Sequence, residues 1–217
     1  MFEQITKNVY GFYDDSPGSN SYLLVGKKIV FIDSGLRSNA QFLVQCLETI
    51  GLKPENIDLV LFTHGHSNHF SGSQVFSKAE PLMSEHDALL VNVKDRHFTR
   101  SDFFHTNFFP HIRRFVSHGQ EFDLEQFLLR VLITPGHTKG SACYYEPRKK
   151  ILFSGDTLMA EKAGRHDYLS GSRPELLASI QALSKLKIEL LLPGHGKPLK
   201  ENVPMGFAKV IAGLKGR

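Results

Sequence analysis

Hydrophobic positions in the first third of the chain form short strand-like runs, followed by a helical stripe. The segments ITKNVYGFY, SNSYLLVG and KIVFIDSG are rich in β-branched and aromatic residues and are separated by turn residues, so they are predicted strands. Apolar positions recur at helical spacing over residues 38–51, and we expect a helix with Ser38 as its N-cap and Gly51 after its end. The apolar run IDLVLF then predicts a buried strand, directly before a cluster of histidines.

The second half of the chain shows a similar pattern. The runs FLLRVLITPG, SACYYE and KILFSGD are predicted strands, and IELLLPGHG predicts another buried strand that leads into a loop. A helix is predicted over SRPELLASIQALSKL because Ser172 and Glu175 form a capping box at its start, and a last short helix over FAKVIAGL. Two strand-rich halves, each closed by helices, favour an α/β fold with two sheets packed face to face and helices outside.

Residues 85–118 interrupt this pattern with a segment rich in phenylalanine, arginine and histidine, which we expect to be helical and loop-rich. Three interpretations stay open. The segment is a helical layer that buries its phenylalanines, a lid over a metal site, or a surface through which a homodimer forms. As a lid it would recognise a small anionic substrate with an apolar part, and Arg113 and Arg114 would offer forked donors to the anion. We treat 1–217 as a single domain that carries this insertion.

The composition narrows the class of protein only slightly. The 217 residues are 41% hydrophobic and 22% charged, as is usual for a globular protein with a substantial core. A formal net charge of +4 permits an anionic substrate without requiring nucleic acid. Cys46 and Cys143 lie in helix-like and strand-like patterns, which favours free buried thiols in a reducing cytoplasm. With no leader-like start and no apolar run of about 18 residues, we expect a cytoplasmic protein with no membrane partner.

Four separate loops, each after a strand-like run, carry residue types that bind metals. The motifs THGHSNH, TPGHT, SGDT and LPGHG supply His64, His66, His69, His137, Asp156 and His195. Imidazole nitrogen and carboxylate oxygen are typical ligands of Zn²⁺ and similar divalent ions. His64 and His66 are two residues apart in an extended loop, so both can reach one ion, while His69 is displaced enough to reach a second. The joint pattern predicts a metal site.

In this order, the four motifs resemble those of the metallo-β-lactamase superfamily, and the resemblance covers most of the chain. It implies a four-layer αββα sandwich with a two-metal site at one edge of the sheets. By this resemblance, the first metal would be held by His64, His66 and His137. The second would be held by His69 and His195, and Asp156 would bridge the two. Asp33 in FIDSG also matches a family position, and we expect it to accept a hydrogen bond from a ligand histidine rather than only to end a strand.

The segment GDTLMAEKAGRHDYLSGS further resembles the glyoxalase II branch, in which a Gly-Arg-x-Asp sequence follows the bridging aspartate. Arg165 and Asp167 match that sequence, and with the adjacent Tyr168 they are candidate substrate-binding residues. Short glyoxalase II-like hydrolases and persulfide dioxygenases share this segment. We expect the glutathione-binding helical extension of full-length glyoxalase II to be absent here.

Asn68 stands where the family pattern has an aspartate that ligates the second metal and accepts a hydrogen bond from the attacking water. An amide is an uncharged, poorer ligand and a far weaker proton acceptor, so the second metal should bind weakly. We expect Zn²⁺, as one or two ions, with Fe or Mn as alternatives. Asparagine is also a favourable helix N-cap, which is a purely structural explanation of this residue.

Three functions from different classes fit these residues. The first is a metal-dependent hydrolase in which metal-bound hydroxide attacks a thioester, lactone or small ester, with Asn68 and Asp156 at the reacting centre. The second is a mononuclear iron oxidoreductase like the persulfide dioxygenases, using His64, His137 and Asp156 as a facial ligand set. The third is a weakened site that serves binding or sensing.

Overall fold

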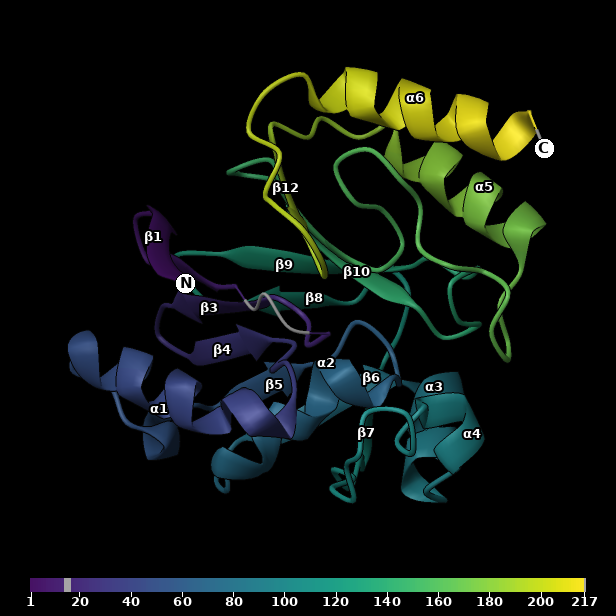
Figure 1. Cartoon of the computed structure of the whole chain (residues 1–217). Coiled ribbons are helices and arrows are strands. Elements are labelled where there is room, and N and C mark those ends of the chain that lie inside the picture. Colours follow the sequence, from purple (N-terminus) through teal and green to yellow (C-terminus); the bar gives the residue numbers. More distant parts are fainter. Residues whose placement is uncertain (14–16, 217) are drawn as a thin grey trace.

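Two β-sheets lie face to face at the centre of the protein, and helices cover the outer face of each (Figure 1). The structure is a computed structural model that describes residues 1–13 and 17–216. Within these residues the first sheet has the order β1-β2-β3-β4-β5-β6-β7 and the second the order β12-β11-β10-β9-β8. This arrangement confirms the predicted α/β sandwich of four layers.

The strands of the first sheet are β1 (Phe2–Thr6), β2 (Val9–Phe12), β3 (Ser21–Val25), β4 (Ile29–Ile32), β5 (Leu59–Leu61), β6 (Glu80–Ser84) and β7 (Arg114–Val116). Those of the second sheet are β8 (Glu121–Asp123), β9 (Leu128–Ile133), β10 (Ala142–Glu146), β11 (Ile151–Gly155) and β12 (Leu190–Pro193). Strands β4 to β7 pair in parallel, as do β11 and β12, whereas the other pairs are antiparallel. Loops that follow the parallel strands therefore emerge at one edge of each sheet, where ligand sites form in open α/β sheets.

The helices are α1 (Ala40–Thr49), α2 (Ser67–Phe70), α3 (Glu85–Asn92), α4 (Arg96–Thr99), α5 (Arg173–Leu183) and α6 (Val203–Lys215), with 3₁₀ turns at Arg37–Asn39, Pro54–Asn56 and Ser71–Val75. Helices α1 to α4 lie on the side of the first sheet, and α5 and α6 cover the second (Figure 1). None of the helices in the described residues is long and apolar enough to cross a membrane.

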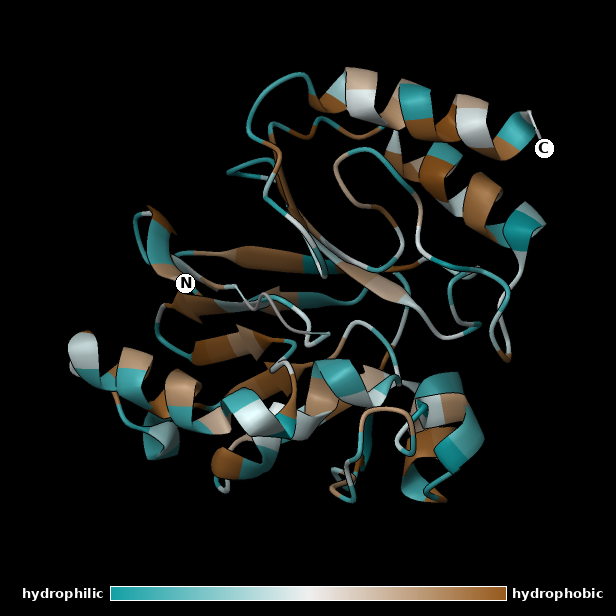
Figure 2. Ribbon diagram, viewed as in Figure 1, coloured by the Kyte–Doolittle hydropathy of each residue, from teal (hydrophilic) through white to brown (hydrophobic). Residues whose placement is uncertain are grey.

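Three apolar cores separate the four layers. The central one lies between the sheets and includes Leu24 and Phe153, which are fully or almost fully buried. The second lies between the first sheet and its helices, around Phe31, and the third lies between the second sheet and α5 and α6, around Leu152. Hydrophobic residues accordingly follow the strands and the inward helix faces, while polar residues face outward (Figure 2). Three layers of burial give the loops at the sheet edge a rigid base.

Two local predictions about helix starts had different outcomes. The Oγ of Ser172 accepts a hydrogen bond from the backbone nitrogen of Glu175 at 3.5 Å, which confirms Ser172 as the N-cap of α5. The prediction for Ser38 was wrong. A 3₁₀ turn over Arg37–Asn39 precedes α1, so Asn39 occupies the N-cap position. The thiols of Cys46 and Cys143 are free and buried, as predicted.

The 85–118 segment is only partly helical. It contains α3 and α4, then an irregular stretch, and it ends in β7, which adds an unpredicted parallel strand beside β6. Phe98 in α4 is buried, and Phe108, Phe109 and Phe115 pack against the core beneath the first sheet, so these phenylalanines are buried or partly buried as expected, although only Phe98 is in a helix. Phe103, in contrast, is 63% exposed.

Candidate metal centre

The predicted ligands meet at the edge where the two sheets adjoin. The β5 strand leads into the loop that carries His64, His66 and His69, and His137 follows β9. Asp156 directly follows β11 and His195 follows β12. The structure therefore brings together all six residues, although they come from loops far apart in the sequence.

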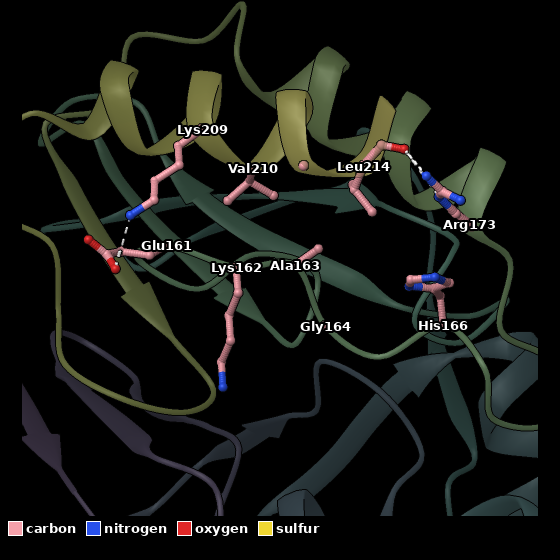
Figure 3. A pocket seen from close by; sticks show the side chains of 10 residues that line it. Glu161, Lys162, Ala163, Gly164, His166, Arg173, Lys209, Val210 and Leu214 are labelled. Carbon is pink, nitrogen blue, oxygen red and sulfur yellow. Dashed lines mark hydrogen bonds and ion pairs between the residues drawn. The ribbon is translucent and has the colours of Figure 1, made fainter. Parts of the chain in front are cut away.

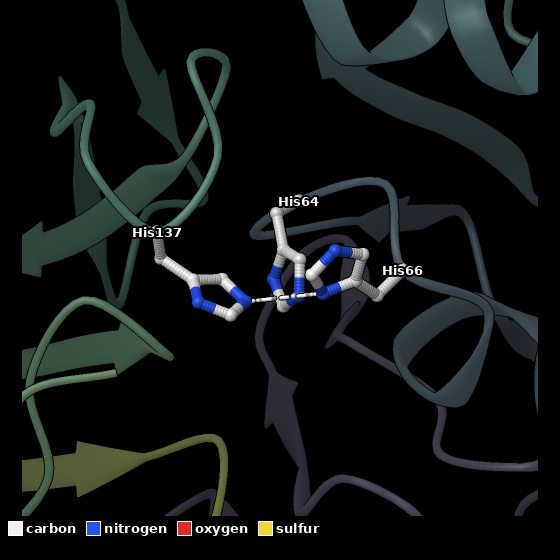
Figure 4. Close-up of side chains that lie close together, drawn as sticks. All are labelled: His64, His66 and His137. Carbon is white, nitrogen blue, oxygen red and sulfur yellow. Dashed lines mark hydrogen bonds between the residues drawn. The ribbon is translucent and has the colours of Figure 1, made fainter. Parts of the chain in front are cut away.

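Three histidine rings converge through single nitrogen atoms (Figure 4). The Nδ1 of His66 lies 3.0 Å from the Nε2 of His64 and 3.1 Å from the Nε2 of His137, and these two Nε2 atoms are 3.2 Å apart. All three side chains are buried. Ligand nitrogens that surround a tetrahedral zinc ion at its usual bond length are about 3.3 Å apart, so this spacing fits one ion.

Hydrogen bonds outside the triangle fix the tautomers of two of these rings. Asp33 Oδ2 accepts a hydrogen bond from the hydroxyl of Thr63 at 2.7 Å, so the Thr63 oxygen in turn accepts from Nδ1–H of His64 at 3.1 Å. Similarly, Nδ1–H of His137 donates to the backbone carbonyl of Arg165 at 2.5 Å. Both rings are thereby left with a lone pair on Nε2, directed into the triangle, which is the arrangement that metal ligands need.

A second group of ligand atoms adjoins the first and contains His64, His69 and Asp156, with ligand atoms all within 4.8 Å of one another. Oδ1 of Asp156 lies 3.4 Å from Nε2 of His69, while Oδ2 lies 3.6 Å from Nε2 of His137 and 3.7 Å from Nε2 of His195. The carboxylate thus stands between the two groups, where the family resemblance expects a bridge.

The chemistry of these donors fits a divalent cation. Within the described residues, Nε2 of His69 and Oδ1 of Asp156 are buried without a hydrogen-bond partner. Since Nδ1 of His69 is directed at Asp33, Nε2 and Oδ1 are two acceptors 3.4 Å apart, and a cation satisfies both: a metal ion, or the second proton of His69 when no metal is bound. Nitrogen donors with one carboxylate suit zinc, iron or manganese.

Burial has a uniform effect on the first group. It lowers the pKa of His64 and His66 well below the ordinary value, and neighbouring imidazoles lower both further. Burial also lowers the pKa of His137. All three rings are therefore neutral at neutral pH, which is the form that binds metals.

The second group has the opposite electrostatics. Burial acts to lower the pKa of His69, but the carboxylates of Asp156 and Asp33 outweigh it and raise that pKa to about 9. Burial acts to raise the pKa of Asp156, but its interactions with His69 and His195 outweigh burial and hold that pKa well below its usual range, while burial lowers the pKa of His195 itself. In the protein without metal, His69 and Asp156 form an ion pair.

Asp33 lies where the sequence predicted a supporting carboxylate. It is buried, and its Oδ2 is 2.8 Å from Nδ1 of His69, which orients that ring. Its Oδ1 also accepts a hydrogen bond from the backbone nitrogen of Thr63 at 2.8 Å. One carboxylate therefore acts on the orientation of His69 directly and of His64 through Thr63.

Asn68 lies inside α2, which begins at Ser67 after the N-cap residue His66. The interpretation of Asn68 as the helix N-cap was wrong, because the chain enters the helix before this residue. Its Nδ2 donates to the carbonyl of Pro17 at 3.0 Å, and this fixes the amide orientation because a carbonyl can only accept. The same Nδ2 is 3.2 Å from Nε2 of His195, so its second hydrogen faces the lone pair that this ring would offer to a metal.

Asp87 in α3 was not recognised from the sequence. Its side chain is fully buried, and it accepts hydrogen bonds from the backbone nitrogens of Gly65 and Gly140, both at 2.9 Å, and from the hydroxyl of Thr138 at 2.7 Å. Gly65 lies between His64 and His66, and Thr138 follows His137. Asp87 therefore connects the two loops that supply the first group, and no local motif identified it.

The candidate substrate residues fall into two places. Tyr168 lies beside the centre, with its ring 5.9 Å from that of His66, and the guanidinium of Arg165 lies 4.2 Å from the Tyr168 ring and pairs with Asp167. Arg114 instead pairs with Glu80 at 3.0 Å, beside β6 and β7. Arg113 is exposed in the same region, so the structure does not bring Arg113 and Arg114 together with Tyr168.

A cavity of about 330 Å³ lies under α6, on the other side of the loop after Asp156 (Figure 3). A Cβ at Gly164 would be 1.8 Å from the carbonyl oxygen of Asp156, so this glycine lets the two loop segments touch. Lys209 pairs with Glu161 at 3.2 Å, and Nε of Arg173 donates to the carbonyl of Leu214 at 3.1 Å. Lys209 thus has an acidic partner, and Arg173 is hydrogen-bonded to the end of α6.

Comparisons with known proteins agree with this geometry. The sequence profile of the metallo-beta-lactamase superfamily matches residues 15–195. A probable metallo-hydrolase of Methanocaldococcus jannaschii is 31% identical over 211 residues, which are 94% of this chain and 97% of that protein. A hydroxyacylglutathione hydrolase of Haemophilus influenzae is 30% identical over 176 residues, covering 78% of this chain and 81% of that protein. The crystal structure of a metallo-beta-lactamase family protein from Thermus thermophilus matches with a TM-score of 0.83 and 21% identity, covering 98% of this chain and 81% of that one.

Proposed function

Because this chain belongs to the metallo-beta-lactamase superfamily and is a metallo-hydrolase by its relatives, we propose that it hydrolyses small thioesters with a single firmly held metal ion. The observation that carries the proposal is the triangle of ring nitrogens at 3.0 to 3.2 Å with Asp156 beside it. The similarity to a hydroxyacylglutathione hydrolase supports an acyl-sulfur bond as the target.

The residues that would hold this ion are His64, His66 and His137. A divalent ion bound there lowers the pKa of a bound water toward about 7 and polarises a carbonyl oxygen. Asp156 is ionised and adjacent, so its carboxylate is placed to accept a proton and to orient a water molecule. Asp33 and Thr63 hold the His64 ring in the tautomer that this requires. Zinc is our proposal for the metal, with iron or manganese as alternatives.

The same geometry supports weak binding of a second ion. His69, Asp156 and His195 would hold it, but Asn68 brings no charge and donates a hydrogen toward the lone pair of His195. A cation there must displace this donor and break the ion pair between His69 and Asp156.

Metal analysis and a thioester assay test the proposal together. We expect one zinc equivalent in the purified protein and release of free thiol from S-lactoylglutathione or acyl N-acetylcysteamine thioesters. His137→Ala should lose both the metal and thiol release, whereas His111→Ala, which alters an exposed histidine outside the centre, should keep both. Two firmly bound ions would disprove the single-metal proposal, and the absence of thiol release from every thioester would disprove the substrate class.

The environment of Asn68 favours one alternative, a mononuclear iron dioxygenase of the persulfide type. Such an enzyme needs a single ion with open coordination positions, held by His64, His137 and Asp156. Oxygen consumption with glutathione persulfide by protein purified anaerobically with iron separates the two functions. Oxygen uptake without thioesterase activity would favour the alternative.

A further inference from the structure

A second cavity, of about 430 Å³, adjoins the metal centre on the side of the 85–118 segment. Its walls come from α4 and the turn after it, and from the loop that contains Tyr168 and Leu169. The ring of Tyr168 separates this cavity from His66, because it lies 5.9 Å from that imidazole. The volume falls within the usual range for small-molecule sites.

Arg100 is the cation of this cavity that has no acidic partner. Arg96 pairs with Asp102, and Arg165 pairs with Asp167. The Arg100 guanidinium, in contrast, lies against aromatic rings, and no carboxylate within the described residues forms an ion pair with it. Its central carbon is 3.9 Å from the ring centre of Tyr168, 4.6 Å from that of Phe103 and 5.5 Å from that of Phe104. Cation–π contacts of this kind hold the side chain in place, while its N–H donors remain available.

The backbone at Arg100 is unusual as well. Arg100 ends α4 in the left-handed region, with φ 57° and ψ 25°. Glycine is the residue favoured there, and a larger side chain costs about 1 kcal/mol. The arginine therefore occupies a backbone conformation that glycine would adopt with less strain, as several other non-glycine residues of the described chain do.

The rest of the cavity lining combines exposed apolar side chains with Arg96, His97, Asp102 and Asp167, and both of these carboxylates are paired with arginines. Phe103 is 63% exposed and Leu169 is 48% exposed, although both are large hydrophobic side chains. Together with Arg100 they form an apolar surface beside one positive charge that has no carboxylate partner, while the carboxylates of the lining are neutralised by Arg96 and Arg165. Such a site suits a ligand that has an apolar body and an anionic end.

We infer that this cavity binds the anionic end of the substrate, with Arg100 as the anion-binding residue and Phe103 and Leu169 against the apolar part. The inference rests on the proposed thioesterase function. Since Tyr168 lies between Arg100 and His66, an apolar spacer must separate the anion from the thioester carbonyl. The substrate class is thus an apolar acyl thioester that ends in a carboxylate or a phosphate.

The test compares three N-acetylcysteamine thioesters with the same six-carbon acyl chain, ending in methyl, carboxylate or phosphate. For the wild-type protein we expect a higher kcat/KM for at least one anionic substrate than for the methyl one, and the preferred anion distinguishes a carboxylate site from a phosphate site. In Arg100→Gly the anionic-to-methyl ratio of kcat/KM should fall roughly 10- to 100-fold, since charge-assisted hydrogen bonds are lost. Arg100→Lys should recover part of the ratio, because it keeps the charge but not the fork.

Three controls keep this test decisive. Glycine suits the left-handed backbone, so Arg100→Gly should melt no lower than the wild type. Arg148→Gln alters an exposed arginine in the turn between β10 and β11 and should leave every rate unchanged. Arg113→Gln should leave the anionic-to-methyl ratio unchanged, because the Arg113 side chain is outside the cavity.

Calorimetric titration with adipate and hexanoate separates this inference from the proposed function. If no thioester is hydrolysed but adipate binds more tightly than hexanoate in an Arg100-dependent way, the anion site stands and the thioesterase proposal falls. An unchanged ratio in Arg100→Gly, or an equal loss on all three substrates, overturns the anion site even when thioesters are hydrolysed.

Discussion

The two groups of ligands lie side by side but are stabilised in different ways. In the first, formed by His64, His66 and His137, burial keeps the rings neutral, and their nitrogens converge on one point. In the second, His69 carries a raised pKa of about 9 and pairs with Asp156, and His195 faces the amide of Asn68. The first group needs a cation to relieve its crowding, while the second already has internal partners. Neighbouring sites with the same types of ligand can therefore differ sharply in metal affinity.

Removing the residue that belongs to both groups should have the largest effect. A ring nitrogen of His64 lies within 4.8 Å of the other ligand atoms in each group, so His64→Ala should lower zinc affinity at least about 100-fold and abolish thioester hydrolysis. Zinc affinity is measured by competition with a chelating dye. His111→Ala is the matched control, and wild-type affinity in His64→Ala would show that His64 does not bind the ion.

Asp87 holds the two loops that supply the first group, so its substitution should affect that group and leave the second unchanged. Asp87→Ala leaves three buried donors without an acceptor, so the free energy of unfolding should fall by about 3 kcal/mol. Zinc affinity should fall too, because the loops of His64 and His137 lose their link. Denaturant titration and zinc competition measure the two effects.

Asp102→Ala provides the comparison for Asp87. Asp102 pairs with Arg96, but its side chain is 71% exposed. We therefore expect Asp102→Ala to change the free energy of unfolding by less than about 0.5 kcal/mol. Equal effects of the two substitutions would mean that Asp87 does not organise the site.

Asn68→Asp should strengthen the second group without altering the first. The carboxylate adds a negative ligand and removes the amide hydrogen that faces His195, so we expect a second zinc equivalent with roughly 10- to 100-fold tighter binding. Elemental analysis and calorimetry count the ions. In the double variant Asn68→Asp, His195→Ala the second ion should be lost again, and its retention would place it elsewhere.

The smallest effect concerns the pH dependence of the metal-free protein. The lowered pKa values in the first group mean that the unfolded chain, with an ordinary histidine pKa of 6.5, binds more protons in acid, so stability declines below that pH. The raised pKa of His69 contributes stability that is full below pH 6.5 and is lost as pH rises through about 9. Melting temperature measured with a chelator should therefore peak near pH 6.5, and His69→Gln should remove the alkaline decline.

Much of this molecule could be predicted because strand runs and ligand motifs are local in sequence. The buried run before His64 and the motifs around His137, Asp156 and His195 indicated the edge where the loops meet. Ser38 shows the limit of such signals, because a 3₁₀ turn displaced the helix start in a way that composition does not reveal. For Asn68, likewise, the helix begins two residues earlier than an N-cap role requires.

The residues that the sequence did not reveal act through tertiary contacts. In the sequence Asp87 resembles any polar helix residue, and its role is visible only from its hydrogen bonds to Gly65 and Gly140 in the folded protein. Arg100 was one of several arginines in the 85–118 segment. It is distinguished by its place in the cavity and by its contacts with aromatic rings, while Arg96 and Arg114 pair with acidic residues. Charge pairing across a fold has no signature in spacing along the chain.

The distribution of ligands between the two sheets also bears on when the protein can acquire its metal during synthesis. The first group remains incomplete until His137, in the second half, packs against His64 and His66. The second group also needs His195, whose loop is held by hydrogen bonds from Asn20 Nδ2 to the carbonyls of Pro193 and Gly196 at 3.0 and 2.8 Å. Since a ribosome adds about 5–20 residues per second, the nascent chain spends seconds with an open, histidine-rich edge. We therefore expect metal uptake only after the second half of the chain has packed against the first.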